Sequence, residues 1–141
     1  MNKQFTVLFI ALGEYGTLED LSSGSNPQVL KYYAKTGNSW VKDDGVAWCA
    51  AFVGYCLEMA LIASTKLLNA RSYLKWGKAT LEPKLGDIVV FWRISPTSPY
   101  GHVAFFIKKD KNYVWVLGGN QSDSVKIEKY PITQVLSYRT Y

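Results

Sequence analysis

The chain has 141 residues, and its hydrophobic content of 48% with 19% charged residues is typical of one soluble globular domain, residues 1–141. A short apolar run at residues 5–12 cannot span a bilayer and is followed by no small-residue cleavage site, so we expect neither membrane insertion nor a signal peptide. The formal net charge of +5 suits an anionic partner. The basic residues are scattered and form no nucleic-acid reader motif, so nucleic acid is not the partner we expect.

The first half of the chain carries helical patterns. We expect helices over residues 4–15, from Asn26-Pro27 until Gly37-Asn38, from Trp48 to about Leu61, and between Asn69 and Gly77. Proline in the first turn favours the second start, and apolar residues at helical spacing mark the third helix. The pattern places Cys49 on the inward side at the beginning of this central helix.

Beyond Pro83 the pattern changes to strands. The expected strands cover residues 87–92, 103–108, 112–117, 125–130 and 135–138, with a hairpin turn at Lys109-Asp110-Lys111. Helices first and an antiparallel sheet second predict an α+β fold with the N-terminal helices packed on the C-terminal sheet.

The two cysteines differ in their helical positions. Cys49 and Cys56 are seven residues apart on one helix, which separates their Cα atoms by about 10.5 Å, too far for a disulfide. The unpaired N–H groups at a helix start lower a thiol pKa and favour the thiolate at Cys49. Cys56 lies in the middle of the helix and is expected to be structural.

His102 is the single histidine of the chain, and it follows Gly101 at the beginning of a predicted strand. A helix-initiating cysteine with a strand-initiating histidine supplies the nucleophile and the general base of a thiol hydrolase. Either residue alone is more often structural, but the combination favours catalysis. We therefore predict Cys49 as the nucleophile and His102 as its base.

A third residue should accept a hydrogen bond from the other ring nitrogen of His102. If the hairpin turn centres on Asp110, Asn120 is the diagonal neighbour of His102, and if it centres on Lys111, Asn120 is directly opposite. A shift of half a residue would send Asn120 to the other face of the sheet. We therefore predict Asn120 as the third residue, with Gln121 as the alternative and otherwise a substrate contact.

Two tryptophans are candidates for the walls of a substrate groove. Trp48 is adjacent to the nucleophile, and Trp92 ends an apolar strand; either could instead fill the core. One histidine and two cysteines without a Cys-x-x-Cys pair do not make a zinc set, so no metal is expected. The predicted chemistry needs no cofactor.

Several blocks of the sequence together resemble a small bacterial and phage family of cell-wall hydrolases. These blocks are Trp48-Cys49-Ala50-Ala51-Phe52-Val53, Ala70-Arg71-Ser72, Gly86-Asp87-Ile88-Val89-Val90-Phe91, Gly101-His102-Val103 and Leu117-Gly118-Gly119-Asn120-Gln121. The family is related to the CHAP amidases and NlpC-type peptidases, which share a papain-like fold. The resemblance implies the same roles for Cys49, His102 and Asn120.

The resemblance and the triad together predict a cysteine peptidase or amidase that cuts an amide bond in peptidoglycan. An inactive wall-binding module of the same fold and a transglutaminase-like thiol acyltransferase are the alternatives. Peptidoglycan is the expected partner, an inhibitor or immunity protein is a further candidate, and we expect a monomer. Such a protein would be made in the cytoplasm and act on the wall after release or secretion, as a phage endolysin, an antibacterial effector or a remodelling enzyme does.

Overall fold

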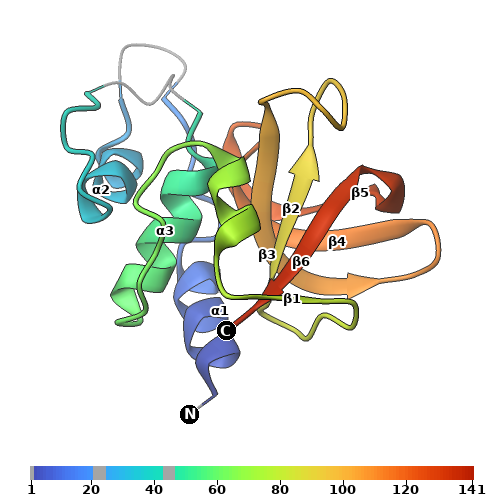
Figure 1. Cartoon of the computed structure of the whole chain (residues 1–141). Coiled ribbons are helices and arrows are strands. Elements are labelled where there is room, and N and C mark those ends of the chain that lie inside the picture. The colour runs from blue at the N-terminus through green and yellow to red at the C-terminus, as the bar shows by residue number, and fades with distance from the viewer. Residues whose placement is uncertain (1, 21–24, 43–46) are drawn as a thin grey trace.

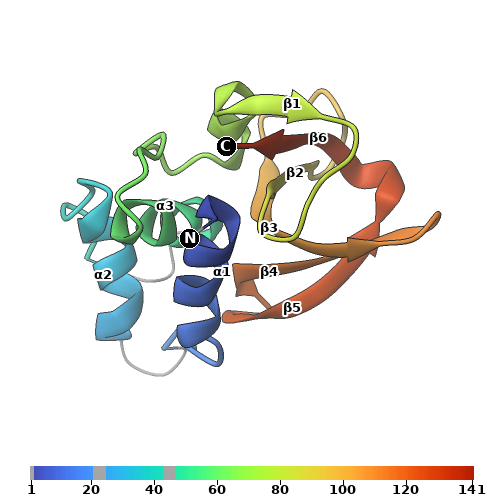
Figure 2. The same ribbon diagram turned by 90° about the horizontal axis from the view of Figure 1, so that it is seen from below.

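The computed structural model describes residues 2–20, 25–42 and 47–141 (Figure 1). Their helices are α1 (Lys3–Gly13), α2 (Pro27–Lys35), α3 (Cys49–Met59) and the short 3₁₀ helices η1 (Ala70–Lys75) and η2 (Ile132–Gln134). Their strands are β1 (Lys78–Thr80), β2 (Ile88–Trp92), β3 (Gly101–Lys109), β4 (Tyr113–Gln121), β5 (Ser124–Pro131) and β6 (Val135–Thr140). Figure 2 shows the three α-helices gathered on one side and the curved sheet on the other, which confirms the α+β prediction.

All six strands join one antiparallel sheet in the order β1-β6-β2-β3-β4-β5. The five expected strands are present, most of them longer than predicted, and β1 is an additional edge strand that pairs with β6. Its three residues are too few to show the alternation that identifies a strand in a sequence. Strand β3 lies between β2 and β4, so His102 stands near the middle of the sheet.

Local sequence explains where most elements begin and turn. The Asn26 side chain accepts a hydrogen bond from the Gln28 N–H and caps α2, whose first residue is proline as expected. At the β3–β4 turn the Asp110 carboxylate accepts the N–H groups of Asn112 and Tyr113, which fixes the hairpin. The helix expected after Asn69 is instead the 3₁₀ helix η1, and the Asn69 side chain makes no capping bond to it.

Helix α3 is the centre of the packing. Eight of its 11 residues are buried, and it contacts α1, α2, β3 and β4, so it is covered on nearly every side. The main core lies between the helices and the sheet and includes alternate strand residues such as Val103 and Phe105. The intervening residues, such as Ala104 and Phe106, form a second, smaller cluster on the other face of the sheet.

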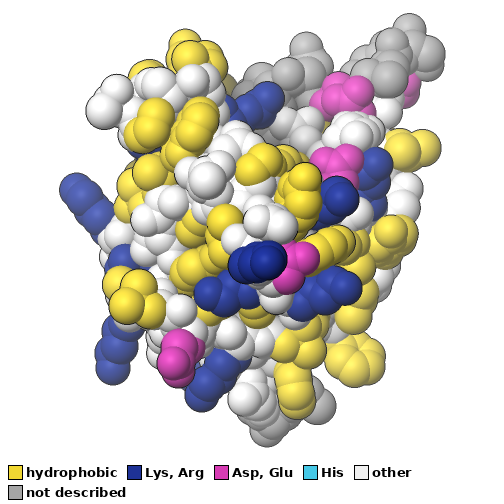
Figure 3. Space-filling view, turned by 90° about the vertical axis from the view of Figure 1, so that its right-hand side faces the viewer, with side chains coloured by type: hydrophobic (Ala, Val, Ile, Leu, Met, Phe, Trp, Pro, Cys, Tyr) yellow, Lys and Arg dark blue, Asp and Glu magenta, His cyan; other side chains and the backbone are white. Residues whose placement is uncertain are grey.

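Lysines and arginines on the outer side of the sheet are mixed with hydrophobic side chains rather than gathered into one patch (Figure 3). Three lysines of the sheet lie over aromatic rings, an arrangement that covers the ring faces with cationic side chains. The pairs are Lys108 over Trp115, Lys109 over Tyr138 and Lys129 over Tyr113. None of the helices that the structure describes is long and apolar enough to cross a membrane.

Candidate active site

Cys49 is the first residue of α3, with Trp48 at the N-cap position. The first-turn N–H groups have no acceptor within the helix, and that of Ala50 points at the Cys49 sulfur together with the N–H of Val103. Burial opposes ionisation of the thiol, but the charge and hydrogen bond of His102, aided by these two N–H groups, outweigh it and lower the Cys49 pKa. These contacts therefore favour the thiolate form of Cys49.

His102 is the second residue of β3 and pairs with Phe91 on β2. Its ring stacks on Phe91 with centroids 6.0 Å apart and lies 5.3 Å from the ring of Tyr130, so aromatic packing holds the imidazole in place. Burial disfavours the imidazolium, but the Cys49 thiolate and the hydrogen bond with Gln121 raise the His102 pKa. The opposite shifts of the two groups favour a thiolate–imidazolium pair.

The partner of the other ring nitrogen is Gln121. Its side-chain oxygen lies 2.9 Å from His102 Nε2, and both side chains are buried. The Gln121 amide nitrogen donates to the backbone oxygen of Lys126 at 2.6 Å and that of Val116 at 3.4 Å, so the side-chain oxygen must face the ring. His102 therefore carries a proton on Nε2, which leaves Nδ1 as the nitrogen that exchanges a proton with Cys49.

The prediction that Asn120 holds the imidazole is wrong, and Gln121, the alternative, takes this position. The ladder pairs Phe105 with Leu117, the register in which Asn120 would stand opposite His102 if β4 stayed regular. It does not stay regular: Asn120 has a left-handed backbone with φ 57°, and the β4–β5 pairing shifts between Gly118 and Gln121. This bulge breaks the alternation of faces and turns Gln121 toward the ring.

Two glycines before the bulge allow this close packing. A Cβ at Gly118 would lie 2.7 Å from the Ala104 Cβ and 3.1 Å from the Gln121 side-chain oxygen. A Cβ at Gly119 would lie 2.7 Å from the Phe52 Cβ and 2.8 Å from the Trp48 ring. The pair therefore lets β4 lie against the beginning of α3 while leaving room for the amide of Gln121.

The two tryptophans have different roles. Trp48 is fully buried, packs 5.9 Å from the Tyr32 ring and donates its indole N–H to Glu19 at 2.9 Å. Its predicted place in a substrate groove is wrong, because the ring is fully buried in the core. Trp92 lies in the wall of a pocket, with its indole N–H bonded to the backbone oxygen of Thr133.

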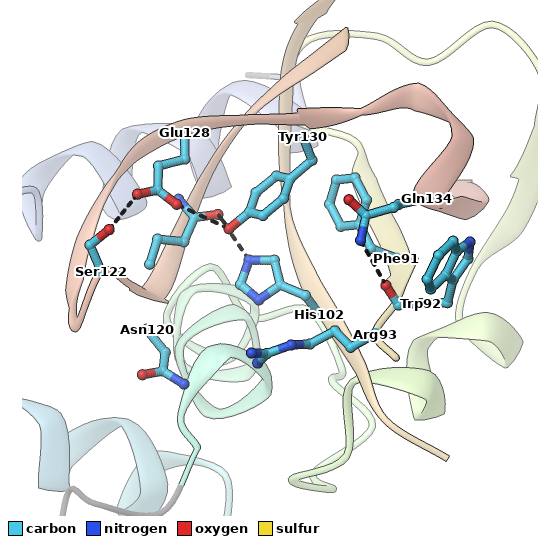
Figure 4. Close-up of a pocket in the computed structure, with 10 residues that line it drawn as sticks. Phe91, Trp92, Arg93, His102, Asn120, Ser122, Glu128, Tyr130 and Gln134 are labelled. Carbon is cyan, nitrogen blue, oxygen red and sulfur yellow. Dashed lines mark hydrogen bonds between the residues drawn. The ribbon is translucent and has the colours of Figure 1, made fainter. Parts of the chain in front are cut away.

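This pocket, of about 250 Å³, opens beside His102 (Figure 4). Its lining comes from β2 and the residue after it, from β3, from the β4–β5 hairpin and from η2. The residues are Phe91, Trp92, Arg93, His102, Asn120, Gln121, Ser122, Glu128, Tyr130 and Gln134. Asn120 thus reaches the pocket, but Figure 4 shows its amide apart from the His102 ring. The lining is largely polar, which suits a hydrated peptide or glycopeptide better than an apolar ligand.

A hydrogen-bonded chain continues from Gln121 into the pocket. The Tyr130 hydroxyl lies 3.2 Å both from the Gln121 side-chain oxygen and from the Glu128 carboxylate, and its single proton can go to one of them at a time. Glu128 also accepts from Ser122 and pairs with Lys126 at 3.0 Å. These surrounding residues carry no recognisable motif, and only the hairpin brings them to the site.

Cys56 is buried and takes no part in this arrangement. Burial, with the nearby Glu14 charge, raises the pKa of its thiol well above the usual value, which keeps it protonated. Both cysteines are free thiols, as the helical spacing predicts. Among the residues that the structure describes, no group of three or more His, Cys, Asp or Glu side chains could hold a metal ion.

Comparison with known proteins identifies one family. The model of the CHAP domain matches residues 41–120, more than half of the chain. A search among curated proteins found no match.

Three solved structures resemble the fold at low sequence identity. An NLP/P60-family lipoprotein of Staphylococcus aureus has a TM-score of 0.55 and 15% identity over 97% of this chain, which spans 41% of that protein. The P60 domain of an antigen of Mycobacterium avium paratuberculosis has a TM-score of 0.56 and 13% identity, covering 99% of this chain and 93% of its own. RipD of Mycobacterium tuberculosis, a non-catalytic NlpC/p60 domain protein adapted to peptidoglycan binding, has a TM-score of 0.54 and 16% identity, covering 98% and 95%. These likenesses establish a papain-like fold of the NlpC/P60 type.

Proposed function

Because the chain belongs to the CHAP-domain family, we propose that it is a cysteine hydrolase that cleaves an amide bond in bacterial peptidoglycan. The observation that carries this proposal is the sequence of contacts from the Cys49 thiol to the His102 ring and on to Gln121. A buried cysteine with a lowered pKa beside a histidine with a raised pKa has little structural value but is what thiol catalysis requires. Only the membership of the CHAP-domain family points to peptidoglycan as the substrate.

The reaction begins with attack of the Cys49 thiolate on the carbonyl carbon of the amide. The new S–C bond pushes electrons onto the carbonyl oxygen, and collapse of the tetrahedral intermediate breaks the C–N bond. His102 gives the proton on Nδ1 to the departing amine. A water molecule then attacks the thioester while Nδ1 takes its proton, which releases the acid and restores the thiolate.

The oxyanion would be stabilised from the beginning of α3. The backbone N–H of Cys49 has no acceptor within the helix and belongs to the positive end of the helix dipole. Donors held rigidly by a packed helix cost no reorganisation as the negative charge develops. The buried surroundings of α3 supply that rigidity.

The second candidate is a peptidoglycan-binding domain without activity. The likeness to RipD favours it, because that protein is non-catalytic and adapted to binding. The intact set of Cys49, His102 and Gln121 favours the enzyme, because binding alone does not need an activated thiol. In either case we propose that the protein acts at the bacterial wall after release or secretion from the cell in which it is made.

The test is mass spectrometry of the fragments released from purified peptidoglycan. We expect the wild type to release stem-peptide fragments, Cys49→Ala to release none and Cys56→Ala to behave as the wild type. Intact free stem peptides would identify the glycan–peptide amide as the bond that is cut, and truncated peptides would identify a bond within the stem. A folded wild type that binds the wall and releases no more than Cys49→Ala would overturn the hydrolase and support the binding domain.

A further inference from the structure

Arg93 stands directly beyond the end of β2, between two pockets. One is the polar pocket beside His102, and the other, of about 320 Å³, is lined by Ala47, Arg93, Ile94, Tyr100 and Gly101. Figure 4 shows the Arg93 side chain directed toward Asn120, with its guanidinium below the His102 ring in this view. A chain that crosses the site from one pocket to the other would pass this cation.

The backbone of Arg93 is held by the loop that follows it. Its N–H donates to the Tyr100 oxygen at 3.2 Å, and its own oxygen accepts from the Ser95 N–H at 2.8 Å and from the Ser98 hydroxyl. Ile94, a β-branched residue, has a left-handed backbone with φ 73°, which is strained. These contacts hold the loop in the conformation that directs Arg93 toward the site.

The side chain of Arg71, on η1, holds the same loop. Its three side-chain nitrogens donate to the backbone oxygens of Tyr100, Pro96 and Ser95 at 2.9, 3.0 and 3.1 Å. The Gly101 Cα also lies against Arg71, because a Cβ there would be 3.2 Å from the Arg71 Cγ. All three side-chain nitrogens of Arg71 thus hold the loop that carries Arg93.

The guanidinium of Arg93 has no hydrogen bond or ion pair with any residue that the structure describes. The carboxylate that shares its pocket, Glu128, is already engaged by Lys126, Ser122 and Tyr130. Within residues 2–20, 25–42 and 47–141, no carboxylate therefore compensates the positive charge of Arg93. This charge also opposes the protonation of His102, an effect that an anion bound to Arg93 would offset.

We propose that Arg93 is a specificity-determining residue that binds a free carboxylate of the substrate next to the amide bond that is cut. A guanidinium donates two parallel hydrogen bonds to a carboxylate, which fixes both position and orientation. This proposal rests on the proposed function, because peptidoglycan stem peptides carry such carboxylates. Two sources are available on a stem peptide: the α-carboxylate of its γ-linked glutamate, and the carboxylate at its C-terminus.

The experiment measures binding in a Cys49→Ala background, so that it does not depend on hydrolysis. Synthetic stem peptides are titrated by calorimetry in three forms: unmodified, amidated at the glutamate α-carboxylate, and amidated at the C-terminus. We expect one of the two amidations to weaken binding about tenfold or more, and that amidation identifies the source. Adding Arg93→Gln should weaken binding of the unmodified peptide to the same level and abolish the difference between the peptides.

Arg93→Lys, which keeps the charge but not the paired donors, should retain part of the discrimination. Lys111→Gln, at the exposed β3–β4 turn, removes the same net charge and should leave the binding of all three peptides unchanged. Equal effects of amidation with and without Arg93→Gln would overturn the proposal, as would the absence of binding by any peptide. A protein that shows Arg93-dependent discrimination but releases nothing from walls would lose the proposed hydrolase activity and keep the carboxylate site.

Discussion

The Nε2 atom of His102 and the side-chain oxygen of Gln121 lie 2.9 Å apart, and this bond decides which ring nitrogen faces Cys49. The orientation of the Gln121 amide is fixed in turn by the backbone oxygen of Lys126. A peptide carbonyl in the β4–β5 hairpin thus selects the histidine tautomer that can take a proton from the thiol. Gln121 acts on the reaction through His102 and is a positioning residue.

Replacing Gln121 by Ala should lower kcat/KM roughly tenfold to a hundredfold, because the ring loses its orientation and its preferred tautomer. Asn120→Gly is the matched control, since glycine accepts the left-handed backbone at position 120 and only the amide is lost. Steady-state kinetics on a soluble muropeptide checks the rates. Nitrogen NMR of the single imidazole should show less proton on Nε2 in Gln121→Ala. Larger losses in Asn120→Gly would contradict the assignment.

The pKa of His102 should fall when Cys49 is replaced by Ala. Burial lowers the imidazole pKa, and in the wild type the thiolate charge and hydrogen bond outweigh burial and raise it. Without the thiolate, burial and the Arg93 charge still lower the His102 pKa, and only the hydrogen bond with Gln121 raises it. With one histidine in the chain, an NMR titration follows this group without assignment. An unchanged midpoint in the variant would show that the two groups are not coupled.

Alkylation should distinguish the two thiols. The lowered pKa of Cys49 means that its thiolate persists as the pH falls below the range of an ordinary thiol, about 8.5. Iodoacetamide at neutral pH should therefore modify one thiol per folded chain, and Cys49→Ala should abolish the reaction while Cys56→Ala should not. Mass spectrometry gives the stoichiometry. An alkylation rate that rises only as the pH passes through the pKa range of an ordinary thiol would contradict the thiolate–imidazolium pair.

Gly119→Ala should lower the free energy of unfolding by roughly 1–3 kcal/mol, because the new methyl group would overlap Phe52 and the Trp48 ring. Gly13→Ala is the control, since a Cβ at this helical position meets nothing within 4 Å. Urea denaturation followed by tryptophan fluorescence measures both variants. Equal stability of Gly119→Ala and the wild type would mean that β4 can move away from α3.

Arg71→Lys should raise KM several-fold while leaving the Cys49 alkylation rate within about twofold of the wild type. One ammonium group cannot reach the three carbonyl groups that the guanidinium holds, so the loop carrying Arg93 loses its support. Lys75→Ala, an exposed change on the same short helix, is the control. A fall in alkylation rate equal to the rise in KM would indicate general disruption instead.

The sequence by itself determined the fold class and pointed to Cys49 and His102 as the reacting pair that we propose. Period-3.6 and period-2 patterns are local, so the helices, the five longer strands and the α+β arrangement could be predicted from them. The place of Cys49 at a helix start also follows from the local pattern. His102 was the one candidate for a histidine base because the chain has a single histidine. The spacing that excluded a disulfide follows from helix geometry alone.

Only the tertiary structure decided which residue holds the imidazole and what surrounds it. The prediction for Asn120 assumed a regular strand, whereas β4 has a bulge before Gln121, where Gly118 and Gly119 lie close to other elements. In the core, the Trp48 ring packs against Tyr32 and donates its indole N–H to Glu19. The spacing of residues along the sequence does not reveal these contacts. Arg93 is placed by a loop that a distant arginine holds. Such positions depend on contacts between segments far apart in the chain, which local patterns do not encode.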